Sequence, residues 1–280
     1  MPWLKSQTKA PISTNGEPFH NMPSILSILG VYRLYGALLS RSIKRGEIPK
    51  HVAIILDGNR RWANSKWTSR RFGHIAGADT VENLLEWCHE IGVKIITLYV
   101  FSTENFDRPN EEIQEIFTVI EERLEKLLHD ERIPKFGIRV SAIGKWELLS
   151  PQLQAILKKI EEETKNNSGQ YLNIAIAYGG RAEIVDSVKK IANYVKEGKL
   201  DPDEITQKTI EQSLYTSHLE NPEPDLVIRT SGEERLSGFL LWQSAYSELV
   251  FQDEYWPDFR KIDLMRAIRT YQRRSRRYGR

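Results

Sequence analysis

The sequence predicts an α/β protein with a single, mainly parallel six-stranded sheet that is flanked by helices and preceded by an N-terminal helix. After Pro49, apolar strand-like runs alternate with helix-period segments, which is typical of the crossover units that build parallel sheets. The 280 residues suffice for one large domain, and 40% apolar with 28% charged residues is ordinary for a globular protein. No repeat, low-complexity tract or linker divides the chain after residue 50.

We expect residues 1–47 to be an extension of a domain that covers residues 48–280. Met1–Asn21 is polar and lacks the apolar segment of a secretory signal. Met22–Ser40 is nearly uncharged, and three basic residues follow it within 41–45. This pattern favours an amphipathic helix, either packed on the domain or lying on a membrane surface.

The chain has one cysteine, Cys88, which excludes an internal disulfide framework and a thiolate zinc site. A reducing compartment is therefore compatible with the sequence. We expect a cytoplasmic protein, with peripheral membrane contact left open by the N-terminal helix.

The strands and helices are expected in regular alternation. Six strand-like runs are His51–Leu56, Lys94–Phe101, Phe136–Ile143, Tyr171–Ala177, Leu226–Arg229 and Leu249–Gln252. Five helix-period segments are Ala76–Ile91, Asn110–Arg132, Ser150–Asn166, Arg181–Glu197 and Thr206–His218. The start and stop signals of helices agree with these segments. Pro109 and Pro151 stand where helices open, while Gly92, Gly169 and Gly198 follow helical stretches.

Polar segments follow four of these strands, and each contains at least one arginine. They are Asp57–Arg61, Ser102–Arg108, Tyr178–Arg181 and Arg229–Arg235. Ligands of open α/β sheets bind beyond the carboxyl ends of the strands, so these segments are expected to converge. Six arginines at four strand ends predict a site for at least one polyanion. Their number favours a site for two polyanions.

Asp57 carries the strongest signal, because it follows an apolar strand directly and two arginines follow it. A turn-capping role is the alternative, since Asp-Gly is a common turn pair. A carboxylate beside guanidinium groups suits a diphosphate held with a divalent cation, so we favour a metal or catalytic role. Arg60 and Arg61 are adjacent and cannot both point into one pocket from a regular helix. We expect one of them to lie at the surface, and we favour Arg61 as that surface residue.

Several other residues have weaker signals. Arg70–His74 precedes a helix whose amide groups would favour an anion, although a lone histidine is more often structural. Ser102–Asn105 has the composition of an ordinary polar loop, but its place after a strand and before Arg108 favours substrate contact. Arg229 and Arg235 flank a Ser-Gly turn, which suits two guanidinium groups closing on one phosphate.

The C-terminal residues 260–280 carry eight arginines and one lysine against one acid. A solvated helix, a nucleic-acid footprint and arginines that reach a phosphorylated ligand all fit this charge. No nucleic-acid motif accompanies it, so we expect no nucleic-acid partner. The chain also lacks a P-loop, a dinucleotide fingerprint, a paired-histidine metalloprotease motif and the Asp-Asp-x-x-Asp of helical prenyltransferases.

Taken together, the motifs resemble those of the cis-prenyltransferase family, the undecaprenyl and dehydrodolichyl diphosphate synthases, and the resemblance covers about residues 48–280. The matching segments are His51–Ala63, Arg70–Gly77, Leu98–Pro109, Tyr178–Arg181, Asp225–Arg235 and Phe239–Trp256. The resemblance implies a homodimeric, Mg²⁺-dependent enzyme that condenses isopentenyl diphosphate onto an allylic diphosphate, with each new double bond in cis.

The family pattern also implies roles for individual residues. Asp57 would be the essential carboxylate and a magnesium ligand, Asn105 would serve proton abstraction, and Glu248 would bind metal across the dimer interface. The allylic diphosphate set is Gly58, Asn59, Arg60, Arg61, Trp62, Arg70 and His74. Substrate contacts are also implied for Ser102, Thr103 and Glu104, and for the isopentenyl diphosphate set Arg108, Arg229, Arg235, Leu236 and Ser237.

A neutral amide is a poor base, so we hypothesise that Asn105 positions the leaving proton toward a diphosphate oxygen. The growing chain needs an apolar tunnel, which Ile113–Leu128 and Ile95–Phe101 could line. Arg277–Gly279 matches a C-terminal motif that reaches the neighbouring active site in family dimers.

The chain departs from bacterial members in ways that favour an archaeal or eukaryotic type. Arg60, Phe106 and Glu234 replace a common glycine, tryptophan and histidine. We expect a precursor of a glycosyl carrier lipid, made from a farnesyl or geranylgeranyl primer. Helix 110–132 lacks the insertion of very long-chain synthases, which predicts products of about C50–C60. The alternative is a non-catalytic partner subunit of a heteromeric enzyme.

Overall fold

The computed structural model describes residues 31–274, so the helix expected within 22–40 lies partly, and the Arg277–Gly279 motif wholly, outside them. The chain divides into two units after Leu38, and the second unit holds the whole sheet. Helix α2 (Val31–Ile43) crosses this boundary, and its last turns bury Leu39 and Ile43. Across residues 31–274, no helix combines the length and apolarity that a membrane span requires.

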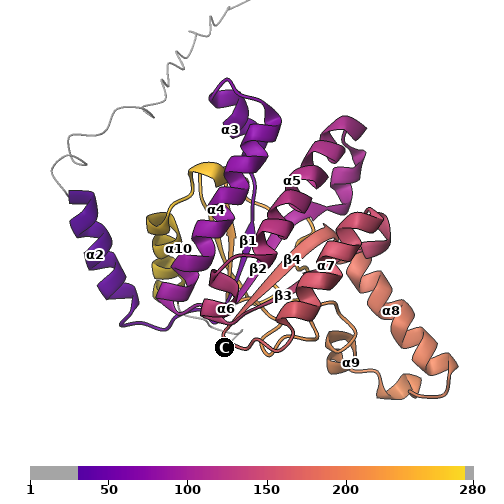
Figure 1. The fold of residues 1–280 in the computed structure, drawn as a ribbon. Coiled ribbons are helices and arrows are strands. Elements are labelled where there is room, and N and C mark those ends of the chain that lie inside the picture. The colour runs from indigo at the N-terminus through magenta and orange to yellow at the C-terminus, as the bar shows by residue number, and fades with distance from the viewer. Residues whose placement is uncertain (1–30, 275–280) are drawn as a thin grey trace, which may run out of the picture. The chain divides into compact units, whose positions relative to one another are not determined.

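The second unit is built on a single sheet of six parallel strands, as predicted (Figure 1). Their order is β3-β4-β2-β1-β5-β6. The strands are β1 (His51–Ile55), β2 (Ile95–Ser102), β3 (Ile138–Ile143), β4 (Gln170–Tyr178), β5 (Leu226–Arg229) and β6 (Glu248–Phe251). Strand β1 is central, since its Val52 pairs with Ile96 of β2 on one side and with Leu226 of β5 on the other.

Helices and short 3₁₀ turns connect the strands. The helices of this unit are α3 (Asn59–Ser65), α4 (Arg70–Ile91), α5 (Asn110–Leu128), α6 (Arg132–Phe136), α7 (Pro151–Thr164), α8 (Gly180–Lys196), α9 (Gln207–Glu211) and α10 (Lys261–Arg273). The 3₁₀ turns are η1 (Thr103–Asp107), η2 (Trp146–Leu148), η3 (Pro202–Glu204) and η4 (Trp256–Asp258).

Three helix predictions need correction. Helix α4 starts at Arg70 rather than near 76, because the Ser69 hydroxyl caps it by accepting the Phe72 N–H at 3.2 Å. The segment predicted as one helix over 110–132 ends at Leu128, and the Asp130 carboxylate then accepts the Arg132 N–H that opens α6. The helix predicted over Thr206–His218 shortens to the single turn-and-a-half of α9.

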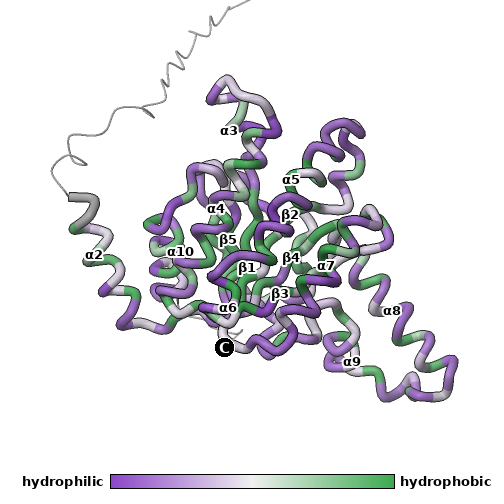
Figure 2. The backbone as a smooth tube through the Cα atoms, in the orientation of Figure 1, coloured by the Kyte–Doolittle hydropathy of each residue, from purple (hydrophilic) through white to green (hydrophobic). Residues whose placement is uncertain are grey.

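The sheet is covered on both faces, as its apolar strands require (Figure 2). Successive side chains of a strand point to opposite faces. On β2, Leu98 and Val100 therefore face α4 and α5, while Tyr99 between them faces a cluster on the other side that includes Phe239 and Leu240.

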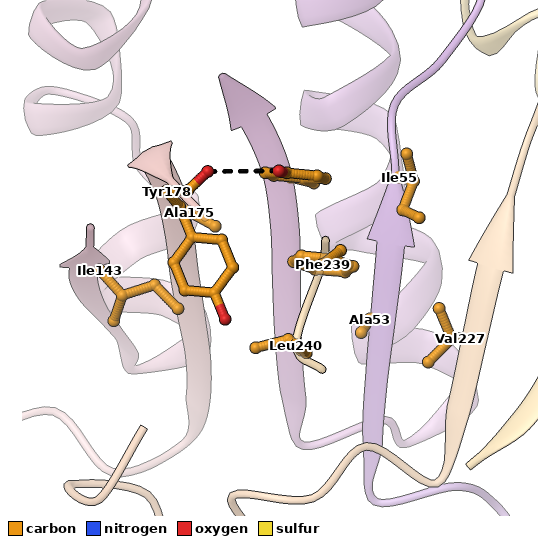
Figure 3. Packing of buried hydrophobic residues seen from close by; sticks show 9 residues of the cluster. Ala53, Ile55, Ile143, Ala175, Tyr178, Val227, Phe239 and Leu240 are labelled. Atoms are coloured by element: carbon orange, nitrogen blue, oxygen red, sulfur yellow. Dashed lines mark hydrogen bonds between the residues drawn. The ribbon is translucent and has the colours of Figure 1, made fainter. Parts of the chain in front are cut away.

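That second face is a packed aromatic core (Figure 3). Tyr99 stacks on Phe239 with ring centroids 4.6 Å apart and meets Tyr178 edge-on at 5.9 Å. The Tyr99 hydroxyl donates to the Tyr178 carbonyl at 3.2 Å, the dashed line in Figure 3, and to the Ser237 carbonyl at 3.3 Å. The core thus fixes the backbone at the carboxyl ends of the strands.

Candidate active site

A cavity of about 1100 Å³ lies beyond the carboxyl ends of β1, β2, β4 and β5. The four polar segments predicted from the sequence all contribute to its wall. The predicted site residues that line it are Asp57, Gly58, Asn59, Arg60, Arg61, His74, Ser102, Thr103, Glu104, Asn105, Arg108, Arg229, Arg235 and Ser237. We refer to this cavity as the polar chamber.

Asp57 stands where β1 opens into the polar chamber. Its Oδ2 accepts the Arg229 Nη2–H at 2.8 Å, and its Oδ1 lies 3.4 Å from Arg61 Nη2. Burial alone would raise the pKa of Asp57, but the hydrogen bond and charge of Arg229, together with the charge of Arg61, outweigh it and hold the pKa below its ordinary value. The carboxylate is therefore ionised at neutral pH.

Gly58 makes this turn possible. Its φ of 109° lies in the left-handed region, and a Cβ there would approach Ser231 Cβ to 2.9 Å. The chain can then enter α3 directly after Asp57. This places Asn59, Arg60 and Arg61 on the first turn of a helix beside the carboxylate.

Arg229 is the most deeply buried guanidinium of the chamber wall, with 5% of its side chain exposed. Besides Asp57, it donates to the Ser237 hydroxyl at 2.8 Å and to the Arg235 carbonyl. Its Nε is buried without a hydrogen-bond partner among residues 31–274. Two of the residues around it, Ser231 and Ser237, have positive φ values of 75° and 47°, so the loop that carries these groups is strained.

The expectation that only one of Arg60 and Arg61 enters the pocket is wrong, although Arg61 does reach the surface as expected, with 42% of its side chain exposed. Arg61 lines the chamber and donates to the Ser231 carbonyl at 3.1 Å and to Glu233 at 3.2 Å. Arg60 lines the same chamber on another side, where its Nε lies 3.5 Å from Glu112. The two side chains do diverge, but the chamber is wide enough to take both.

Asn105 is fixed by a local cap. Its Oδ1 accepts the Ser102 N–H at 3.1 Å within the capping box that opens η1. With the oxygen committed to the backbone, the amide nitrogen is the group that Asn105 offers to a ligand.

His74 and Asn59 meet the interior of the chamber from α4 and α3. Burial lowers the pKa of His74 to about 4, and the charge of Arg108 acts in the same direction against that of Glu112. The ring is therefore neutral at pH 7. Within the part of the chain that the structure describes, His74 Nε2 and Asn59 Oδ1 are buried without hydrogen-bond partners. Unsatisfied polar atoms of this kind mark a place for a ligand.

A second, apolar cavity of about 140 Å³ opens between α4, α5 and the sheet. It shares Leu56, Asn59, His74, Val100 and Ile116 with the chamber wall, so the two hollows adjoin. Most of its other lining residues are aliphatic: Ala78, Val81, Leu85, Leu98, Val119, Ile120, Leu124, Leu127, Leu172 and Ile174. The rest are Gly77, Trp256 and the charged Glu82, Arg123, Lys126 and Asp130. We call it the apolar channel, and it agrees with the predicted tunnel between 113–128 and 95–101.

The far end of the apolar channel is charged. Glu82 of α4 accepts from Arg123 at 2.9 Å and from Lys126 at 2.8 Å, both on α5, and it also pairs with Arg132 at 3.2 Å. These ion pairs tie α4 to α5 where the aliphatic lining stops.

Four predicted site residues do not line the polar chamber. Arg70 lies behind the wall and pairs with Glu112, while Trp62 stacks on Phe72 with centroids 6.1 Å apart. Leu236 packs against the aromatic core. Glu248 begins β6, at the opposite end of the strands from Asp57, and pairs with Arg274 at 3.1 Å. A metal role for Glu248 would need a second copy of the chain and stays a prediction.

The sequence reasoning missed Glu112 and Glu233. Glu233 lies inside the predicted segment Arg229–Arg235, where only the arginines drew attention. Glu112 stands in the first turn of α5, where acids are common, but it also lies on the stripe of α5 that continues as Ile116 and Ile120, both of which are buried. A charged residue on an apolar stripe was the signal that could have found it.

The chamber suits a hard cation held together with a substrate. Among residues 31–274, no three His, Cys, Asp or Glu side chains gather into a metal cage. Mg²⁺ is commonly bound by one or two carboxylates plus substrate phosphates, keeping several waters. Asp57 supplies one ionised carboxylate, and the guanidinium groups around it supply the charge for the phosphates. The residues therefore fit a cation that arrives with a diphosphate.

Comparison with known proteins gives consistent results. The profile of a family described as putative undecaprenyl diphosphate synthase matches residues 55–279. The tritrans,polycis-undecaprenyl-diphosphate synthase (geranylgeranyl-diphosphate specific) of Methanopyrus kandleri is 51% identical over 255 residues, covering 91% of this chain and 93% of the relative. The enzyme of the same name from Methanocaldococcus jannaschii is 50% identical over 250 residues, covering 89% of each chain.

Solved structures agree with the sequence relatives. Lavandulyl diphosphate synthase from Lavandula x intermedia, in complex with dimethylallyl diphosphate, has a TM-score of 0.81 and 37% identity, covering 83% of this chain and 99% of that one. A probable undecaprenyl diphosphate synthase from Campylobacter jejuni has a TM-score of 0.68 and 32% identity, covering 84% and 99%.

Proposed function

The chain belongs to the undecaprenyl diphosphate synthase family, and from that premise we propose which polyprenyl diphosphate it makes and how its residues do so. The resemblance to cis-prenyltransferases seen in the sequence motifs is confirmed, and the protein is a prenyltransferase. We propose that it condenses several isopentenyl diphosphates onto geranylgeranyl diphosphate. The primer follows the names of the relatives, which specify geranylgeranyl diphosphate.

The observation that carries the proposal is the junction of the two hollows. The polar chamber presents Asp57 and six arginines, and the apolar channel starts from its wall at His74 and Ile116. A diphosphate with an isoprenoid tail has the same division, with its charge at one end and its hydrocarbon at the other. The volume of about 1100 Å³ leaves room for a second diphosphate beside the first.

Each set of residues would bind one substrate. Asn59, Arg60, Arg61 and His74 would hold the allylic diphosphate at the mouth of the channel, supported by Arg70, and Arg108, Arg229, Arg235 and Ser237 would hold the isopentenyl diphosphate. Mg²⁺, held by Asp57 together with diphosphate oxygens, would supply charge neutralisation of the leaving group. The arginines would stabilise the same developing negative charge.

The condensation breaks the allylic carbon–oxygen bond, forms a carbon–carbon bond to the isopentenyl unit and releases one proton. The amide nitrogen of Asn105 would orient the isopentenyl diphosphate so that this proton leaves toward a diphosphate oxygen. The aliphatic wall of the channel would exclude water from the allylic carbon. The extended hydrocarbon would then move along the channel after each cycle.

We propose products of about C50–C60, which would serve as precursors of a glycosyl carrier lipid, and a homodimer as the working form. The dimer would let Glu248 approach a neighbouring site. Sedimentation equilibrium would test the assembly, because a monomer at assay concentrations would remove any role for Glu248 in metal binding.

The deciding assay uses purified protein with Mg²⁺, isopentenyl diphosphate and either farnesyl or geranylgeranyl diphosphate, followed by mass spectrometry of the products. We expect polyprenyl diphosphates near C50–C60, with faster turnover on the geranylgeranyl primer. Only much longer products would contradict the length, and a preference for farnesyl diphosphate would contradict the primer. No product from either primer would favour the partner-subunit alternative.

A further inference from the structure

Glu112 is a buried carboxylate on which three arginines converge. Only 4% of its side chain is exposed. Arg70 Nη1 donates to its Oε2 at 2.9 Å, Arg108 Nη1 donates to its Oε1 at 3.1 Å, and Arg60 Nε lies 3.5 Å from Oε1. The arginines come from α4, from the end of η1 and from α3, so one carboxylate joins three separate elements.

The Glu112 carboxylate is surrounded by groups that attract a negative charge. It lies in the first turn of α5, where the helix dipole favours negative charge. A buried charge is tolerated when it is paired and hydrogen-bonded, and Glu112 has three cationic partners. Without it, three guanidinium groups would repel one another at the chamber wall.

The arginines are only partly used by Glu112. Each of them reaches the carboxylate through a single nitrogen, whereas a guanidinium has five N–H donors in a rigid fork. Arg60 and Arg108 both line the polar chamber. Glu112 therefore fixes the orientation of each fork and leaves most of its donors for an anion.

We propose that Glu112 is a positioning residue that couples the two diphosphate subsites. The assignment rests on the proposed function, which places Arg60 and Arg70 in the allylic set and Arg108 in the isopentenyl set. Since Arg70 and Arg108 share one carboxylate, an anion that orders one fork also orders the other. Binding of the first diphosphate then favours binding of the second.

The same helix offers a matched control. Glu122, further along α5, pairs with Arg71 at 2.9 Å, but it is 52% exposed and neither residue lines the chamber. Glu122→Gln removes an Arg–Glu pair from the same two helices, α4 and α5, without touching the site. It should leave substrate binding and turnover unchanged.

The first test is calorimetric titration with inorganic pyrophosphate, which needs no catalysis. We expect Glu112→Gln to weaken pyrophosphate binding by at least about fivefold, the lower end of typical coupling between sites. Glu112→Asp should recover part of the loss because it keeps the charge. Tighter binding by Glu112→Gln would overturn the proposal, because Glu112 would then merely compete with the ligand for the arginines.

The second test is a double-mutant cycle on Arg70→Lys and Arg108→Lys, read as the KM for each substrate. With Glu112 in place, the two substitutions should be non-additive, and each should raise the KM for both substrates. In Glu112→Gln they should become additive. Additive effects with Glu112 in place would overturn the coupling, and this arm needs only proteins that retain Glu112, so it stands if Glu112 variants do not fold.

The two proposals fail in different ways. If the wild-type protein makes no polyprenyl product, the proposed function fails. The pyrophosphate titration then still tests whether Glu112 positions the arginines for anion binding. If the wild-type protein is active and Glu112→Gln has unchanged KM values and pyrophosphate affinity, the proposed function stands and the role of Glu112 is wrong. A change in thermal unfolding alone, at unchanged KM, would reduce Glu112 to a structural residue.

Discussion

The polar chamber and the apolar channel share a wall, yet they are built by different means. The chamber is formed by turns and loops at strand ends, some of them strained, such as the turn at Ser237. The channel is formed by the regular faces of α4, α5 and the sheet. The chamber holds charges at fixed positions, whereas most of the channel wall is aliphatic. We expect substitutions in the chamber to change rate and affinity, and substitutions in the channel to change product length.

The largest effect is expected from Asp57→Asn. Removal of one charge-stabilising group typically lowers kcat by about 10²- to 10³-fold, and here it would also leave Arg229 without its carboxylate partner. Steady-state kinetics at saturating Mg²⁺ would measure the loss. Asp203→Asn, at an exposed position on η3, is the control and should keep normal turnover. Near-normal turnover of Asp57→Asn would contradict the expectation that substitutions in the polar chamber change the rate.

His74, on the shared wall, gives a pH dependence. Its pKa is about 4 in the folded protein against 6.5 for the free side chain, so the unfolded chain binds the proton more readily between these values. The contribution of His74 to the free energy of unfolding is therefore complete above pH 6.5 and is lost as the pH falls toward 4. This loss is at most about 3 kcal/mol. His74→Gln should lose less stability over the same range.

Denaturant unfolding of the wild-type protein and of His74→Gln between pH 4 and 7 isolates the contribution of His74, because the other titrating groups are common to the two proteins. His51, whose pKa burial also lowers to about 4, is present in both. Parallel pH curves would show that His74 is not buried in its neutral form.

Filling the channel should shorten the products without affecting the chamber. Val119→Phe, at a buried position on the channel wall, adds volume where the hydrocarbon would pass, at a stability cost of about 1–3 kcal/mol. Mass spectrometry should show shorter products, while pyrophosphate affinity stays unchanged. Val185→Phe on the exposed side of α8 is the volume-matched control. Products of normal length would exclude this part of the channel as the hydrocarbon path.

The smallest effect is expected at the charged end of the channel. Glu82→Gln removes the carboxylate shared by Arg123, Lys126 and Arg132, and partly exposed ion pairs contribute only up to about 1 kcal/mol each. Because α4 and α5 lose their tie where the lining stops, the product distribution should shift to longer chains. Glu163→Gln, which affects only an exposed pair with Lys159, should change neither stability nor products. An unchanged distribution for Glu82→Gln would show that the channel end does not limit length.

The chamber was easier to predict from the sequence than the channel. Asp57–Arg61 and Ser102–Arg108 are contiguous, so their polar character is visible in the chain itself, and strand order alone brings them together. The channel is assembled from single residues of α4, α5, β2 and β4, and only the three-dimensional packing shows which of them meet. The existence of a tunnel was predictable, but its charged end was not.

Within the chamber, two kinds of contact could not be predicted from the sequence. They depend on how far a long side chain extends and on which elements pack together. Arg60 and Arg61 were not expected to share one pocket because adjacent helical residues diverge, but the long side chain of Arg61 reaches Ser231 and also lines the chamber. Glu112 was overlooked because its three partners lie 4 to 52 positions away along the chain and on different elements. Distances of this kind follow from tertiary packing and have no local pattern.

The central place of β1 has a consequence for synthesis on the ribosome. Val52 pairs with Leu226, and Asp57 meets Arg229 across a sequence separation of 172 residues. One edge of β1 therefore stays unpaired until β5 has been translated, and an open strand edge invites pairing with other chains. The nascent protein would carry the Asp57 carboxylate long before Arg229, the guanidinium that pairs with it, so the polar chamber is completed among the last steps of folding.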